Sequence, residues 1–207
     1  MSFIETKVPE KYKSKVVITG NPIREWILNG DAGAGHKLTG FDEHRPVVLI
    51  MGGSQGATQI NELVRESLDE LLKKFQIVHV VGRGNLDIGV RFTGYRQFEF
   101  LNEELKNVYA MSEMVVTRGG ANSLFEIALL RKKALIIPIG KESSRGDQVD
   151  NARVFVRELG WGLISGDVSA SQFIKALEMA FRNKVNKSEK FKNGTAKVVD
   201  MILNFKK

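Results

Sequence analysis

The feature that most constrains the fold is a repeated alternation between short apolar segments and helical patterns. Val47–Met51 is a continuous apolar run, typical of a strand buried on both faces of a parallel sheet. Residues 58–75 follow with apolar side chains at the spacing of one helical face. The alternation recurs at least four times along the chain. It predicts an α/β fold, a doubly wound parallel sheet with right-handed crossovers.

The same reading assigns the rest of the chain. Further strands are expected at 77–81, 97–101, 114–117, 134–139 and 162–164. Further helices are expected at 103–111, 123–131, 148–159, 169–181 and 188–205. Residues 15–19 read as a short strand or entry segment, and residues 29–35, with three glycines, read as a loop.

Glycine-rich or polar segments follow four of the expected strands. They occupy residues 52–57, 82–84, 118–122 and 140–147. In doubly wound sheets, ligands bind beyond the carboxyl ends of the strands. Four such segments at one edge are more than turns alone require, so the sequence predicts a ligand site there.

The first segment, 52–57, is compatible with phosphate binding. Its glycines allow close backbone approach, a helix start favours anions, and Ser54 adds a hydroxyl donor. An ordinary tight turn between strand and helix is the alternative. The segment matches neither a Walker loop nor the dinucleotide fingerprint.

Two later segments carry sugar-binding chemistry. Glu126 follows the glycine segment 118–122. It is either a first-turn carboxylate that stabilises the helix start, through the helix dipole or a capping box, or an acceptor of hydrogen bonds from a ribose diol. Gln148 and Asn151 follow the polar segment 140–147, which faces either solvent or a sugar. Their amides can donate to and accept from sugar hydroxyls.

Composition and charge exclude several classes of protein. The chain has no cysteine, its three histidines lack metal-ligand spacing, and its apolar runs are far too short to span a membrane. Residues 182–207 carry eight basic and two acidic residues. This charge indicates a solvated helical face or contact with an anionic membrane surface, and no motif accompanies it that indicates nucleic acid.

Five motifs, in order, resemble the C-terminal half of the MurG family, the bacterial transferases that make lipid II in peptidoglycan synthesis. They are GNPIR (20–24), MGGSQGA (51–57), FL (100–101), TRGGA (117–121) with Glu126, and SRGDQVDN (144–151). The SRGDQ variant and LTGF (38–41) are similar to versions from low-GC Gram-positive bacteria. The resemblance covers roughly residues 15–205.

The resemblance implies the C-terminal, Rossmann-like domain of a GT-B glycosyltransferase. Residues 1–15 would be a remnant of an N-terminal domain and its crossover, and residues 16–187 the donor-binding domain. Residues 188–207 would form a helix that packs towards the absent N-terminal domain. The catalytic base and the lipid site would belong to that absent domain, so no catalytic residue is expected in this chain.

The resemblance also implies which residues bind UDP-N-acetylglucosamine. Ser54 would hold the diphosphate, Arg24 and the backbone of Leu101 the uracil, and Glu126 the ribose. Gln148 would read the sugar, and the start of the helix at 121–125 would line sugar and phosphate. The full expected set is Arg24, Ser54, Gln55, Gly56, Leu101, Ala121, Asn122, Ser123, Leu124, Phe125, Glu126, Gln148 and Asn151.

The expected function is donor binding in the transfer of N-acetylglucosamine to a lipid-linked muramoyl-pentapeptide, by an inverting hexosyltransferase that is inactive as this chain alone. No metal and no cofactor are expected. The expected place is the cytoplasmic face of the bacterial membrane, as a peripheral protein. The alternatives are a non-catalytic nucleotide-sugar-binding subunit that needs a separate acceptor chain, and a UDP-sugar hydrolase or epimerase on the same fold.

Overall fold

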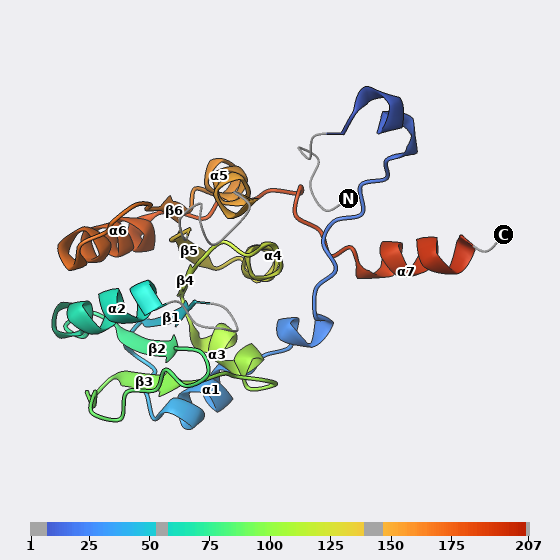
Figure 1. Cartoon of the computed structure of the whole chain (residues 1–207). Coiled ribbons are helices and arrows are strands. Elements are labelled where there is room, and N and C mark those ends of the chain that lie inside the picture. The colour runs from blue at the N-terminus through green and yellow to red at the C-terminus, as the bar shows by residue number, and fades with distance from the viewer. Residues whose placement is uncertain (1–7, 53–57, 139–146, 206–207) are drawn as a thin grey trace.

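The structure is a computed structural model that describes residues 8–52, 58–138 and 147–205. Within these residues, six strands form one all-parallel sheet in the order β3-β2-β1-β4-β5-β6 (Figure 1). The strands are β1 (Val47–Met51), β2 (Gln76–Val80), β3 (Tyr95–Phe98), β4 (Met114–Thr117), β5 (Lys133–Ile136) and β6 (Gly162–Leu163). This arrangement confirms the predicted α/β fold with a doubly wound parallel sheet.

Helices alternate with the strands, as predicted. The α-helices are α1 (Ala32–Thr39), α2 (Thr58–Leu71), α3 (Leu105–Met111), α4 (Ala121–Leu129), α5 (Asp147–Leu159), α6 (Ala170–Arg182) and α7 (Thr195–Asn204). Two short 3-10 helices, η1 (Glu10–Lys15) and η2 (Glu25–Leu28), precede α1.

The sheet has a core on each face because alternate residues of a strand point to opposite sides. In β1, Val48 and Ile50 pack into the core that α2 and α6 cover. Val47, Leu49 and Met51 pack into the core formed with α3, α4 and α5. Burial on both faces explains why β1 reads as an unbroken apolar run.

The strand order reverses between β1 and β4. The chain adds β2 and β3 on one side of β1, then returns through α3 to place β4 on the other side. The carboxyl ends of the two strands, Met51 and Thr117, lie in register. Such a switch point opens a crevice for ligands in doubly wound sheets. The glycine segments that follow β1 and β4 begin at this crevice.

The prediction of a loop over 29–35 is wrong, because α1 begins at Ala32. The Asp31 carboxylate accepts a hydrogen bond from the backbone N–H of Ala34 at 3.3 Å and so caps the helix. A Cβ on Gly35 would lie 2.6 Å from the carbonyl oxygen of Asn107 on α3. The glycine therefore serves close packing between two helices rather than a turn.

The predictions for both ends of the chain also need correction. Residues 15–19 form no strand; η1 ends at Lys15, and the chain then runs on to one isolated parallel bridge between Asn21 and Asn193. The helix expected over 188–205 begins only at Thr195, whose backbone N–H donates to the Asn193 side chain at 3.0 Å. The residue before it, Gly194, has low helix propensity.

The segment before α7 belongs to the core of the sheet. Phe191 is buried, and its ring stacks on Phe155 of α5 with centroids 4.2 Å apart. In contrast, α7 projects from the body next to the N-terminal segment (Figure 1). Its Ile202 and Leu203 side chains are exposed. Within the described ranges, no helix is long and apolar enough to cross a membrane.

Candidate functional site

A pocket of about 510 Å³ lies where the N-terminal segment crosses α4, on the side of the sheet that carries α4. Three elements line it: the segment before η2, the first turns of α4, and the start of α7. The lining residues are Pro22, Ile23, Arg24, Asn122, Ser123, Glu126 and Thr195. Four of them, Arg24, Asn122, Ser123 and Glu126, belong to the predicted site.

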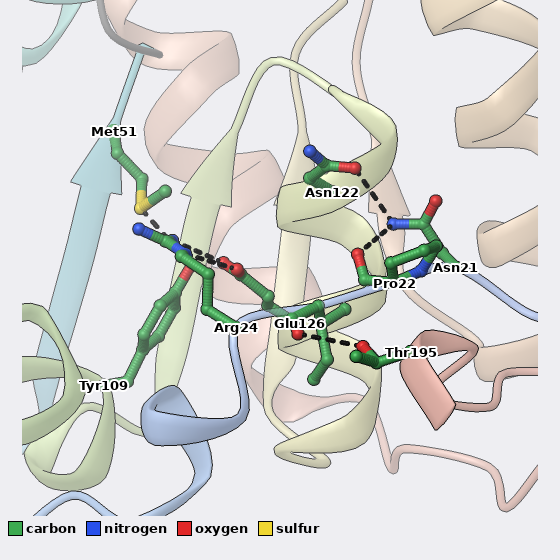
Figure 2. Close-up of polar contacts among 9 residues, drawn as sticks. Asn21, Pro22, Arg24, Met51, Tyr109, Asn122, Glu126 and Thr195 are labelled. Atoms are coloured by element: carbon green, nitrogen blue, oxygen red, sulfur yellow. Dashed lines mark hydrogen bonds and ion pairs between the residues drawn. The ribbon is translucent and has the colours of Figure 1, made fainter. Parts of the chain in front are cut away.

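An ion pair joins two of the predicted residues directly. Nε and Nη2 of Arg24 each donate to one carboxylate oxygen of Glu126, both at 2.9 Å (Figure 2). The Glu126 side chain is only 3% exposed, whereas that of Arg24 is 47% exposed. The hydrogen bond to Glu126 raises the pKa of Arg24. Such a two-pronged pair is among the stronger polar contacts in proteins.

Apolar and aromatic groups surround this ion pair. The Tyr109 hydroxyl donates to the sulfur of Met51 at 3.6 Å (Figure 2). Burial raises the pKa of Tyr109, and the charge of Glu126 raises it further, so the phenol stays protonated. The Arg24 guanidinium also lies 5.0 Å from the ring centroid of Trp26. A low-dielectric setting strengthens polar contacts made within it.

Two further contacts fix the walls of the pocket. The Asn21 side chain donates to the side-chain oxygen of Asn122 at 2.9 Å and so ties the N-terminal segment to α4 (Figure 2). The Thr195 hydroxyl lies 3.2 Å from the carbonyl oxygen of Ile23, which ties α7 to the same segment. The pocket is therefore built from parts of the chain that are far apart in the sequence.

The start of α4 is suited to an anion. Gly119 has φ +98°, a left-handed conformation that favours glycine, and no side chain caps the helix at Gly120. The first N–H groups of a helix have no acceptor within the helix and carry partial positive charge. Arg118 donates to the carbonyl oxygen of Gly52 at 3.2 Å, which brings a cation between the ends of β1 and β4.

The other predicted residues fall into four groups. Ala121 opens α4, while the side chains of Leu124 and Phe125 are fully buried in the core, so only their backbone can face a ligand. Leu101 lies after β3, half-buried against the core. Gln148 and Asn151 lie on α5. The remaining three, Ser54, Gln55 and Gly56, lie outside the described residues.

Gln148 has an unusual environment on α5. Its side-chain oxygen is buried and has no hydrogen-bond partner within the described part of the chain. Its backbone oxygen would lie 3.3 Å from a Cβ on Gly119, so the start of α5 packs against the glycine segment before α4. An unpaired buried acceptor is costly, and a ligand hydroxyl would satisfy it.

Sequence reasoning missed four residues of this region: Asn21, Tyr109, Arg118 and Thr195. Asn21 and Arg118 lie within the GNPIR and TRGGA motifs, so the motifs could have indicated both residues. Tyr109 and Thr195 gave no signal, because their roles follow from contacts across the fold.

A second pocket, of about 590 Å³, lies between α2 and α6 on the opposite face of the sheet. Its lining includes Glu62, Glu66 and Asp167, which would repel an anionic ligand. Among the residues that the structure describes, no group of three or more His, Asp or Glu side chains could hold a metal ion. The pocket at Arg24 and Glu126 is the candidate site, because it brings together four of the residues that the sequence predicts to bind a ligand.

Comparisons with known proteins identify the family of the chain. The chain is 40% identical over 198 residues to a UDP-N-acetylglucosamine–N-acetylmuramyl-(pentapeptide) pyrophosphoryl-undecaprenol N-acetylglucosamine transferase of Clostridium tetani, covering 92% of the chain and 55% of that protein. It is 42% identical over 196 residues to a transferase of the same description from Bacillus anthracis, covering 93% of the chain and 55% of that protein. The chain thus spans about half the length of the curated relatives it matches.

The fold is similar to that of a solved relative. The crystal structure of Acinetobacter baumannii MurG matches with a TM-score of 0.68 at 18% identity, covering 98% of this chain and 59% of that one. The model of the glycosyltransferase family 28 C-terminal domain matches residues 47–204, from β1 to the end of α7. By this match, which covers most of the chain, the chain belongs to glycosyltransferase family 28 and contains the C-terminal domain of that family.

Proposed function

We propose that this chain binds UDP-N-acetylglucosamine as the donor half of a transferase that delivers N-acetylglucosamine to a lipid-linked muramoyl-pentapeptide. The observation that carries the proposal is the Arg24–Glu126 pair at the start of α4, beside the switch point of the sheet. It stands in a chain at least 40% identical to transferases described by this reaction.

Each part of the donor has a matching part of the site. The carboxylate of Glu126 accepts hydrogen bonds from the ribose diol, and the Arg24 guanidinium and the backbone of Leu101 hold the uracil. The start of α4 and the Arg118 guanidinium supply positive charge for the diphosphate. Ser54, which lies outside the described residues, is the further proposed ligand of the diphosphate. The side chains of Gln148 and Asn151, with Asn122 and Ser123, read the sugar hydroxyls.

The proposed reaction is an inverting transfer. The C4 hydroxyl of the muramoyl acceptor attacks the anomeric carbon of N-acetylglucosamine, a new glycosidic bond forms, and the bond to the UDP oxygen breaks. The electron pair leaves with UDP, and the proton of the hydroxyl passes to a base outside this chain. Donors fixed in advance at the diphosphate stabilise the charge that develops on the leaving group.

The acceptor half would have to meet this chain at its two ends. The N-terminal segment and the segment before α7 lie side by side, joined by the Asn21–Asn193 bridge. The exposed apolar side chains of α7, Ile202 and Leu203 among them, offer a face for such a half to cover. The basic residues of 182–207 would then favour peripheral binding at the cytoplasmic face of an anionic membrane.

A second candidate is a non-catalytic subunit that binds the nucleotide sugar and works with a separate acceptor chain. Both candidates share the donor site and differ in whether the two halves belong to one polypeptide.

The deciding experiment is a turnover assay with UDP-N-acetylglucosamine and a lipid-linked acceptor. We expect no turnover by the 207-residue chain alone, because a positioned base contributes about 10²–10⁴ in rate and none is expected here. We expect turnover once the N-terminal half of a relative is added as a second chain. Full activity of the chain alone would contradict the proposal.

A further inference from the structure

The proposed ribose ligand, Glu126, is buried and paired with a residue of the same site. It lines the pocket, yet its side chain is only 3% exposed. Each of its two carboxylate oxygens already accepts a hydrogen bond from Arg24. A vicinal diol that needs both oxygens therefore meets a site that is occupied by the chain's own side chain.

Arg24 is the partner that is able to move. Glu126 is held inside α4, with its backbone carbonyl bonded to the N–H of Leu130 at 2.9 Å. Arg24 precedes η2 with extended backbone, and its side chain is 47% exposed. A change of rotamer would uncover Glu126 without disturbing a helix or strand.

We propose that Arg24 determines ligand specificity by occupying Glu126. Nucleotide binding displaces Arg24 from Glu126, and the ribose diol takes its place. The released guanidinium then turns to an acceptor on the base. Binding breaks a two-pronged, half-buried ion pair, so the ligand must form new hydrogen bonds with both Glu126 and Arg24 to offset the loss. A ligand that lacks either the diol or the base acceptor forms only one of these two sets of hydrogen bonds. The inference rests on the proposed function and explains how the same two residues select a whole ribonucleoside.

The alternative is that the pair persists in the complex. Arg24 uses two of its five N–H groups on Glu126, and each carboxylate oxygen has a further lone pair. A nucleotide bound on top of the intact pair would leave Arg24 and Glu126 joined. The two arrangements differ in the sign of one measurable coupling.

The test is a double-mutant cycle on UDP binding, measured by calorimetry on the full chain. The four proteins are the unsubstituted chain, Arg24→Ala, Glu126→Gln and the double variant. If the pair breaks on binding, each single variant loses one ligand contact but is spared the cost of opening. The double variant loses both contacts, but the cost of opening is removed only once, whereas it is removed in each of the two single variants. Its Kd then rises beyond the product of the two single-variant increases, by about fivefold or more for a pair of this kind.

The controls separate this effect from loss of structure. The Lys74–Glu178 ion pair, at 2.5 Å, joins the turn after α2 to α6 on the other face of the sheet. The pair of variants Lys74→Ala and Glu178→Gln should leave the Kd for UDP unchanged. Arg24→Lys, which keeps the charge and loses the two-pronged geometry, replaces Arg24→Ala in the cycle if the alanine variant does not fold. The expected sign is the same, with a smaller size.

Each outcome is decisive. An increase in Kd for the double variant equal to, or smaller than, the product of the single increases overturns the inference and leaves the proposed function intact. Failure of the unsubstituted chain to bind UDP overturns the proposed function, and the inference with it. A larger-than-product increase supports the displacement of Arg24.

Discussion

Acidification should destabilise this protein through one buried histidine. His79 of β2 has no exposed surface, and its ring nitrogens lie 2.9 Å from the Tyr95 hydroxyl and 3.0 Å from the Asn61 side-chain oxygen. The Asn61 amide nitrogen donates to the carbonyl of Val81, which leaves its oxygen to accept from the imidazole. Burial, and then the charge of Arg65, lower the pKa of His79 to about 3.

The size of the effect follows from the difference in proton uptake. In the unfolded chain the imidazole binds a proton below its ordinary pKa of 6.5, whereas in the folded protein it does so only near about 3. The free energy of unfolding should therefore be flat above pH 6.5 and fall as the pH decreases from 6.5 towards 3. Each unit corresponds to about 1.4 kcal/mol, so His79 should remove about 2 kcal/mol by pH 5.

Urea unfolding at pH 7.5 and at pH 5.0 measures this loss. We expect His79→Gln to lower stability at pH 7.5, because the network with Tyr95 and Asn61 is disturbed, but to remove about 2 kcal/mol of the pH dependence. His44→Gln, at an exposed position in a turn, is the matched control and should keep the dependence. An unchanged pH dependence in His79→Gln would refute the reasoning.

Three further predictions concern stability and use thermal or urea unfolding. Gly35→Ala should lower the free energy of unfolding by about 1–3 kcal/mol, since its Cβ would lie 2.6 Å from the carbonyl oxygen of Asn107, and no loss would contradict the close packing of α1 on α3. Phe191→Ala should cost about 3–5 kcal/mol, because the ring is buried against Phe155, whereas a loss under about 1 kcal/mol would show that the segment before α7 is not part of the core. Ile202→Ala on α7 should change stability by less than about 0.5 kcal/mol, because the side chain is 65% exposed; a larger loss would mean that it is already covered.

Much of the fold was predictable because the core strands carry their own signal. The unbroken apolar run of β1 and the helical spacing of α2 predicted a strand buried on both faces and a helix beside it, and both are confirmed. The glycines of α1 were misread, because the sequence does not distinguish a glycine that makes a turn from one that admits a neighbouring helix. That distinction depends on Asn107 of α3, which is remote in the sequence.

The sequence predicted residues for the candidate site but not the contacts between them. Arg24 and Glu126 were both expected to bind the nucleotide, yet they are 102 positions apart, and nothing local indicates that they pair with each other. Thr195 was not predicted, because its hydroxyl donates to the carbonyl oxygen of Ile23, which is 172 positions away in the sequence. Long-range polar contacts depend on how the ends of the chain cross α4, and periodicity does not carry that information.

The central claim is that this chain binds a uridine nucleotide sugar at Arg24 and Glu126. Calorimetric titration with UDP-N-acetylglucosamine and with ADP-glucose, on the unsubstituted chain and on Glu126→Ala, tests it most directly. The account predicts selective binding of UDP-N-acetylglucosamine and weaker binding in Glu126→Ala. The loss should be at most about 1.5–3 kcal/mol, the value of a hydrogen bond to a charged group, because the variant is spared the cost of opening the ion pair with Arg24. Equal affinity for both nucleotide sugars, or unchanged affinity in Glu126→Ala, would contradict it.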